Sequence, residues 1–157
     1  MQNNIILALL VFTMLCSSGC YSSKQILIKN DKDSNYNLNS DAVPVTIFLY
    51  QLKDIAKFKD ASAIDLIERA DVILGKDKID ITKMQIAPDN QKTIATINKN
   101  DVPYVGFLVV YSKMSKKKKV KSLIESDEIS RNLLELQIKK EGIFIIGKNK
   151  DEELIKW

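Results

Sequence analysis

Histidine is absent from this chain of 157 residues, and both of its cysteines lie within the first 20 residues. The first absence removes the commonest general base and the commonest metal ligand of proteins. The second leaves the body of the chain without a disulfide or a thiolate site. The sequence therefore predicts no metal site and no cofactor, and it leaves only carboxylates, lysines and hydroxyls for chemistry.

Strong charge of either sign is also missing. The chain has 24 Lys and Arg against 20 Asp and Glu, a formal net charge of +4, with a single local concentration of lysine. So mild a balance does not favour a nucleic-acid partner. The length fits one domain with a proper core and is too short for two. We expect a single domain that binds no nucleic acid.

No hydrophobic run is long enough to cross a bilayer. Residues 5–16 form an apolar run of 12 residues, against the roughly 20 that a spanning helix needs, and this length is typical of a signal-peptide core. The small residues Ser17, Ser18 and Gly19 then lead to Cys20, which resembles a bacterial lipobox. We expect a lipoprotein signal peptide over residues 1–19, lipid attachment at Cys20 and a lipidated tether over residues 20–24.

Two alternatives to acylated Cys20 stay open. The usual leucine three positions before the cysteine is replaced by Ser17, and residues 1–4 carry no basic side chain. Cys16 is a rival, although it puts the bulky Leu15 at the cleavage position. Ordinary secretion would leave Cys20 as an unmodified thiol. An Asp directly after the lipidated cysteine would resemble an inner-membrane retention signal. Tyr21 occupies that position here, so an outer-membrane location is the better interpretation.

Residues 46–53, preceded by Val45, have the strongest pattern in the chain. Val45, Ile47 and Leu49 alternate with Thr46, Phe48 and Tyr50, so a period of two gives one aliphatic face and one largely aromatic face. This predicts a central strand with its aliphatic face in a core. The helical stretch that follows is the expected cover for the aromatic face.

The pattern of the rest of the chain predicts short strands with one helical insertion. Residues 102–111 are apolar on both faces, which favours a strand deep in a sheet, and Gly106 within them indicates a close backbone approach. We predict an all-β fold: an antiparallel two-sheet β-sandwich over residues 25–148, with a charged tail at 149–157. The other strands are expected at residues 25–29, 79–86 with a slip near Lys83, 93–98, 120–124, 132–139 and 142–147, and the helices at 54–59 and 62–70.

Two polar segments are candidate binding regions. Residues 30–42 contain four Asn and three Asp, which compete for local backbone bonds and predict a long exposed loop. The lysine run at residues 113–121 is typical of a solvated loop or edge. Its alternative role is contact with anionic lipid or lipopolysaccharide, through Lys116, Lys117, Lys118 and Lys119.

Candidate catalytic groups are weak. Glu68 with Asp71, and Asp127 with Glu128, are interpreted as solvated surface carboxylates. Ser115 and Lys116 are adjacent, so on an extended segment they point in opposite directions. The pattern also suggests no cleft of the kind that catalysis needs. We expect no enzyme and no small-molecule substrate.

Several short motifs occur in a fixed order along the chain: Cys20, Leu38-Asn39, Pro44-Val45, residues 47–54, Phe58, Leu74-Gly75, Ile86 with Pro88, and Tyr104-Val105-Gly106. This ordered set resembles the outer-membrane lipoprotein of type VI secretion systems, the TssJ family, also called VasD or SciN. The chain departs from that family at the lipobox, at Asp89 where Gly is usual, and in lacking a Trp near residues 115–120.

The resemblance implies a transthyretin-like β-sandwich with a helical insertion, held by its lipid to the periplasmic face of a Gram-negative outer membrane. It also implies a partner, the periplasmic region of the inner-membrane subunit TssM, bound in part by the loop between the first two strands. Leu38 and Asn39 are the positions of that loop that match the family. Asn35, Asn37 and Asp41 are added from their polarity. The alternative function is an outer-envelope lipoprotein that binds anionic lipid, glycan or another envelope protein.

Overall fold

The structure is a computed structural model that describes residues 23–146 apart from 116, 130 and 131. Several predictions from the sequence fall outside the described residues: the signal peptide at 1–19, Cys20 with the start of its tether, Lys116 and the tail at 149–157. The side chains of residues 95 and 96 are likewise not described.

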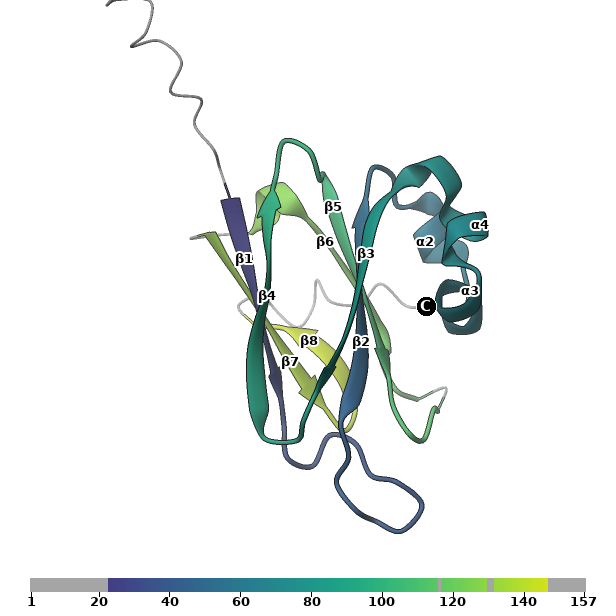
Figure 1. Cartoon of the computed structure of the whole chain (residues 1–157), viewed down its shortest axis with the longest axis vertical. Coiled ribbons are helices and arrows are strands. Elements are labelled where there is room, and N and C mark those ends of the chain that lie inside the picture. Colours follow the sequence, from purple (N-terminus) through teal and green to yellow (C-terminus); the bar gives the residue numbers. More distant parts are fainter. Residues whose placement is uncertain (1–22, 116, 130–131, 147–157) are drawn as a thin grey trace, which may run out of the picture.

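The described residues form two four-stranded sheets that pack face to face (Figure 1). One sheet has the order β4-β1-β7-β8 and the other β3-β2-β5-β6. This confirms the predicted two-sheet sandwich. The strands are β1 (Ser23–Asn30), β2 (Val45–Leu52), β3 (Lys78–Ile86), β4 (Asn90–Asn98), β5 (Tyr104–Val110), β6 (Lys121–Glu125), β7 (Leu133–Lys139) and β8 (Gly142–Ile145).

Strand β2 is central, as its alternation predicts, because it pairs with β3 on one side and β5 on the other. Val45, Ile47 and Leu49 are fully buried in the core between the sheets. Phe48 and Tyr50 on the opposite face join a second core under the helices. Figure 1 shows these helices covering the outer face of the β2 sheet, so the molecule has three layers and two apolar interfaces.

Three short helices form the insertion: α2 (Ala56–Asp60), α3 (Ala63–Glu68) and α4 (Ala70–Leu74). The predicted capping box is present, since Ser62 Oγ accepts from the Asp65 amide at 3.1 Å. The single helix predicted over 62–70 is wrong. It breaks at Arg69, whose backbone leaves the helical region at φ −135°, and the break turns Ala70 and Leu74 of α4 onto the sheet.

Tyr50 and Gly106 of the sheet both contact the insertion. The Tyr50 hydroxyl donates to the Leu66 carbonyl at 2.9 Å, and burial raises the pKa of that hydroxyl. Gly106 faces the Phe58 ring so closely that a Cβ there would lie 2.7 Å from the nearest ring carbon. This is the close backbone approach that the sequence predicts for Gly106.

Lys121 is a buried exception to the solvated lysine run. Its side chain is 7% exposed, and its amine donates to three carbonyls at the end of α2 and just beyond, at 2.9, 2.9 and 2.7 Å. Burial lowers the pKa of Lys121, while Asp60 acts in the opposite direction. The residue therefore fastens strand β6 to the helical insertion.

One strand pair departs from the antiparallel prediction: β1 and β7 run parallel. After β6 the chain passes through a short 3-10 helix, η2 (Ser126–Glu128), and enters the other sheet. It enters at the end where β1 also begins, with Gln25 opposite Leu133. Since both strands start at that end, they can pair only in parallel.

Two local predictions also need correction. The slip predicted near Lys83 is wrong, because pairing is regular there and the irregularity lies between Gln51 and Leu52, opposite Asp80 and Lys78. Strand β1 begins at Ser23 rather than 25, since Ser23 already pairs with Asn98. The last two residues of the expected tether therefore belong to the sandwich.

Candidate functional site

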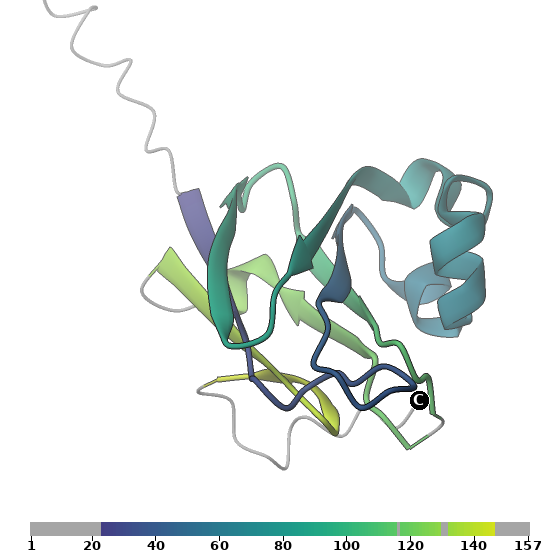
Figure 2. The ribbon, with the colours of Figure 1, turned by 60° about the horizontal axis from the view of Figure 1, so that its bottom comes forward.

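The loop of residues 31–44 joins β1 to β2 at the end of the sandwich opposite Ser23 (Figure 1). Figure 2 brings this end forward and shows the loop beside the β5–β6 connection and the β7–β8 turn. Strand β1 has eight residues and so spans about 26 Å at 3.3 Å per residue. The loop is thus separated by a strand's length from the point where the chain enters the sandwich.

Asn35 holds the neck of this loop. It is 2% exposed; its Nδ2 donates to the Pro44 carbonyl at 2.8 Å, and its Oδ1 accepts from the Ser112 amide at 2.8 Å. The side chain therefore ties both the return of the loop and the β5–β6 connection to one point. This burial departs from the fully exposed loop predicted for residues 30–42.

Asn30 and Ser34 fix the start of the loop in a similar way. Asn30 is 2% exposed and donates through Nδ2 to the carbonyls of Ile86 and Ala87, at 3.1 and 2.9 Å. Ser34, also buried, donates to Asn30 Oδ1. Sequence reasoning missed these two anchors, because the carbonyls that Asn30 binds lie 56 and 57 positions away along the chain.

Asn37 organises the tip. Its Oδ1 accepts from the amides of Asn39 and Asp41, each at 2.9 Å, and its Nδ2 donates to the Asp41 carboxylate at 3.0 Å. Ser40 takes a positive φ of 66° to close the turn. The tip is therefore ordered by side-chain bonds of the kind that asparagine makes in turns.

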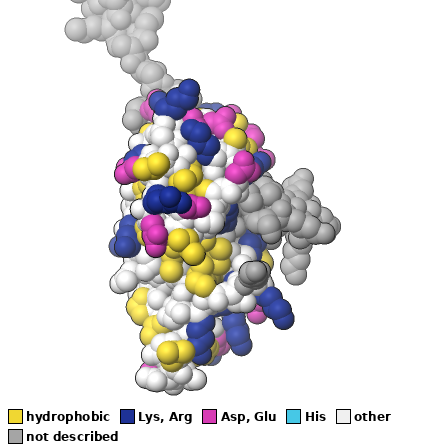
Figure 3. All heavy atoms as spheres, turned by 90° about the vertical axis from the view of Figure 1, so that its right-hand side faces the viewer, with side chains coloured by type: hydrophobic (Ala, Val, Ile, Leu, Met, Phe, Trp, Pro, Cys, Tyr) yellow, Lys and Arg dark blue, Asp and Glu magenta, His cyan; other side chains and the backbone are white. Residues whose placement is uncertain are grey.

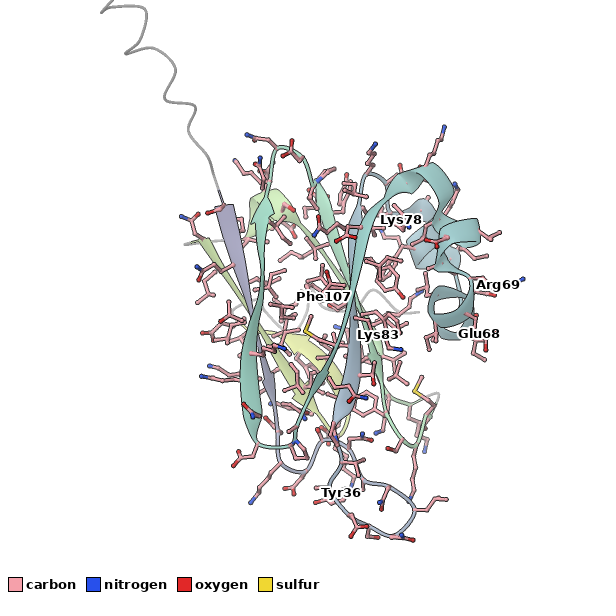
Figure 4. All side chains as sticks on the ribbon, in the orientation of Figure 1. Tyr36, Glu68, Arg69, Lys78, Lys83 and Phe107 are labelled. Carbon is pink, nitrogen blue, oxygen red and sulfur yellow. The ribbon has the colours of Figure 1, made fainter. Side chains whose placement is uncertain are left out.

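Leu38 is the exposed apolar residue at the tip of this loop. Its side chain is 87% exposed although it is one of the most apolar in the loop, and Asn39 beside it is exposed as well. Figure 4 shows the loop, marked by Tyr36, projecting from the end of the sandwich. A large apolar residue on a hydrogen-bonded loop can bind a partner with little ordering cost. Of the five predicted contact residues, Asn35 and Asn37 support the loop, Asp41 caps the tip, and Leu38 and Asn39 face outward.

The predicted lysine contacts lie at the same end as the loop. Lys117 is exposed and Lys118 is half-buried, with its amine 3.9 Å from the centre of the Tyr111 ring. Lys119 pairs with β8: its amide donates to the Glu141 carbonyl and its carbonyl accepts from Ile143, each at 2.9 Å. The run is therefore partly a structural edge, and Lys116 lies outside the described residues.

The candidate carboxylate pairs lie on the surface. Glu68 and Asp71 are exposed on the helical insertion, where Asp71 pairs with Lys78, and Asp127 and Glu128 are exposed in η2. Within the described part of the chain, no group of three or more His, Cys, Asp or Glu side chains is placed to hold a metal ion. Nor does any helix in that part have the length and apolarity of a membrane span.

The described residues thus form a two-sheet sandwich with a hydrogen-bonded loop at one end, and the exposed apolar residue Leu38 lies at the tip of that loop. The family model described as type VI secretion lipoprotein, with the members VasD, EvfM and TssJ, matches residues 23–141. The chain therefore belongs to the type VI secretion lipoprotein family. No curated protein sequence matches it.

Solved structures share the fold at 18% sequence identity. The T6SS lipoprotein TssJ1 of Pseudomonas aeruginosa has a TM-score of 0.70, with 81% of this chain and 96% of that chain covered. Serratia marcescens Lip, a membrane-bound component of the type VI secretion system, has a TM-score of 0.68, covering 81% and 97%. A chain in a structure described as the TssM C-terminal domain (869-1107) from EAEC has a TM-score of 0.69, covering 78% and 99%.

Proposed function

We propose that this protein is a lipid-anchored, non-enzymatic subunit that ties a type VI secretion membrane complex to the outer membrane. In this role it binds the periplasmic region of a TssM-type inner-membrane subunit through the β1–β2 loop. Family membership supports the complex. A chain with this fold occurs in a structure described as the TssM C-terminal domain, which supports a TssM-type partner.

The observation that carries the proposal is the contrast between a buried loop neck and an exposed apolar tip. Asn35 is 2% exposed and Leu38 is 87% exposed, only three positions apart. Covering an exposed apolar side chain removes it from water and lowers the free energy. On this loop, which hydrogen bonds already fix, that favourable change requires a binding partner. Leu38 is therefore the central contact of the proposed interface.

The orientation of the sandwich agrees with a bridging role. If Cys20 carries the lipid, the membrane lies at the β1 end, and the loop lies about 26 Å away at the far end of the eight-residue strand. Lys117, Lys118 and Lys119 are at the loop end, so they would meet the membrane that holds Cys20 only if the sandwich lay on its side. Their position does not favour the alternative of an anionic-lipid binder.

Leu38→Asp tests the interface. We expect it to weaken capture of the cognate TssM-type periplasmic region at least tenfold, because a central apolar contact carries a large share of binding free energy. Val72→Asp is the matched control, since Val72 is 80% exposed on α4, away from the loop. Equal binding of both variants and the wild type would remove the loop from the interface.

The anchor is tested separately. We expect labelled palmitate to enter the wild-type protein and the Cys16→Ser variant but not Cys20→Ser, with the labelled protein in the outer-membrane fraction. Incorporation that persists in Cys20→Ser and is lost in Cys16→Ser would move the lipid to the rival cysteine. No incorporation in any form would contradict lipid anchoring.

A further inference from the structure

A basic pocket opens beside the β1–β2 loop. Its volume is about 390 Å³, at the lower end of the range for small-ligand pockets and enough for one or two side chains. Figure 3 shows Lys and Arg side chains gathered on the lower part of the face it draws, close to this end of the sandwich. Three segments line the pocket: the loop with Ser34, Tyr36 and Ser40, the β5–β6 connection with Lys113 and Lys118, and the β7–β8 turn with Lys140.

Among the described residues, no carboxylate forms an ion pair with the three lysines of this basic pocket. Four other described lysines do form such pairs, within 4.0 Å. Burial lowers the pKa of Lys118, and the charge of Lys140 lowers it further, while Glu141 acts in the opposite direction. Positive charges held close together at a partly dehydrated site favour the binding of an anionic group.

The loop side of the pocket is polar and hydrogen-bonded. Tyr36 pairs across the loop with Ala42, and its hydroxyl donates to Asp33 at 2.7 Å. Lys118 is steadied by its position over the Tyr111 ring, 3.9 Å from the centre. The pocket thus combines three lysines, of which Lys118 is held against Tyr111, with polar walls, and this suits a carboxylate better than an apolar side chain.

We propose that this basic pocket receives an acidic side chain or a short acidic segment of the protein that docks on the β1–β2 loop. This inference rests on the proposed function, because it names the chemistry of the partner at that site. Tyr36 and Ser40 belong to both the pocket and the loop, so a partner seated on Leu38 would also cover the pocket. The distance from the β1 end favours this protein partner over a lipid headgroup.

The test measures the affinity of the full mature protein in detergent for the cognate TssM-type periplasmic region, at low and high ionic strength. The variant replaces Lys113, Lys118 and Lys140 by Gln. We expect about tenfold weaker binding at low ionic strength and a flatter salt dependence, because charges at an interface govern salt sensitivity. The matched control replaces Lys53, Lys76 and Lys92 by Gln. These three are exposed and do not line the pocket, so the control makes the same change in net charge and should bind as the wild type does.

Each contrary outcome has a distinct meaning. Failure of the wild type to bind the periplasmic region would refute the proposed function, and this inference with it. Binding that is lost in Leu38→Asp but unchanged in the pocket variant would overturn this inference alone. An equal loss in the control would reduce the effect to overall charge. Loss of binding to phosphatidylglycerol or lipopolysaccharide vesicles, with partner binding intact, would assign the pocket to lipid. Thermal unfolding of each variant verifies that it is folded.

Discussion

Replacing Asn35 by alanine should destabilise the protein and loosen the loop while leaving its exposed tip chemically intact. Asn35 is 2% exposed, and its side chain makes two hydrogen bonds of 2.8 Å, one to the Pro44 carbonyl and one from the Ser112 amide. These two bonds close the neck of the loop and hold it against the β5–β6 connection. The methyl group of an alanine side chain could make neither of them.

The size of the effect follows from these bonds. Each hydrogen bond contributes a net 1 kcal/mol or so, and a buried partner left without a bond adds roughly 1 to 3 kcal/mol. For two bonds we therefore expect Asn35→Ala to lower the free energy of unfolding by about 3 to 5 kcal/mol, a large fraction of the roughly 5 to 15 kcal/mol typical of a domain. Asn35→Asp should cost at least as much, because it turns a carboxylate oxygen toward the Pro44 carbonyl.

Equilibrium urea unfolding of the purified protein measures this change. Asn39→Ala is the control, because Asn39 is exposed on the same loop, and its effect should stay within about 0.5 kcal/mol. Partner capture should fall in Asn35→Ala through disorder of the loop, whereas Leu38→Asp should lose capture at wild-type stability. A wild-type urea midpoint and wild-type capture for Asn35→Ala would refute the reasoning that this buried side chain holds the loop.

Three further predictions concern the scaffold. Gly106→Ala should cost about 1 to 3 kcal/mol in urea unfolding, because its Cβ would lie 2.7 Å from the Phe58 ring; adding Phe58→Leu should recover part of the loss, and full additivity would contradict the clash. Lys121→Met should cost roughly 1 to 3 kcal/mol, because three carbonyls near the end of α2 lose their donor; unchanged stability would show that water replaces the amine. Burial, and then Glu141, raise the pKa of the Tyr111 hydroxyl, so its stabilising effect is complete below the ordinary tyrosine pKa of about 10 and is lost at higher pH. Stability measured against pH should therefore fall less steeply above pH 10 or so in Tyr111→Phe than in the wild type, and parallel curves would refute this.

Asn35 and Leu38 show how much of the candidate site can be predicted from the sequence. Both were predicted as contacts, Leu38 because it matches the family and Asn35 because it is a polar residue of the same loop. Only the structure separates them, since the Ser112 amide that Asn35 binds is 77 positions away. The basic pocket is harder still to predict, because its lining comes from three connections that the fold brings together.

The sequence by itself determined the local elements. Alternation along Val45–Leu52 defines a strand with two buried faces, Ser62 and Asp65 mark the start of α3, and Gly106 marks a crowded backbone. Each of these depends on neighbours a few positions apart, where side-chain spacing alone fixes which face is apolar. Only the tertiary structure decided that β1 and β7 run parallel, that Lys121 is buried against the insertion, and which loop residues face outward. Those outcomes depend on hydrogen bonds between residues far apart in the chain, which no local pattern encodes.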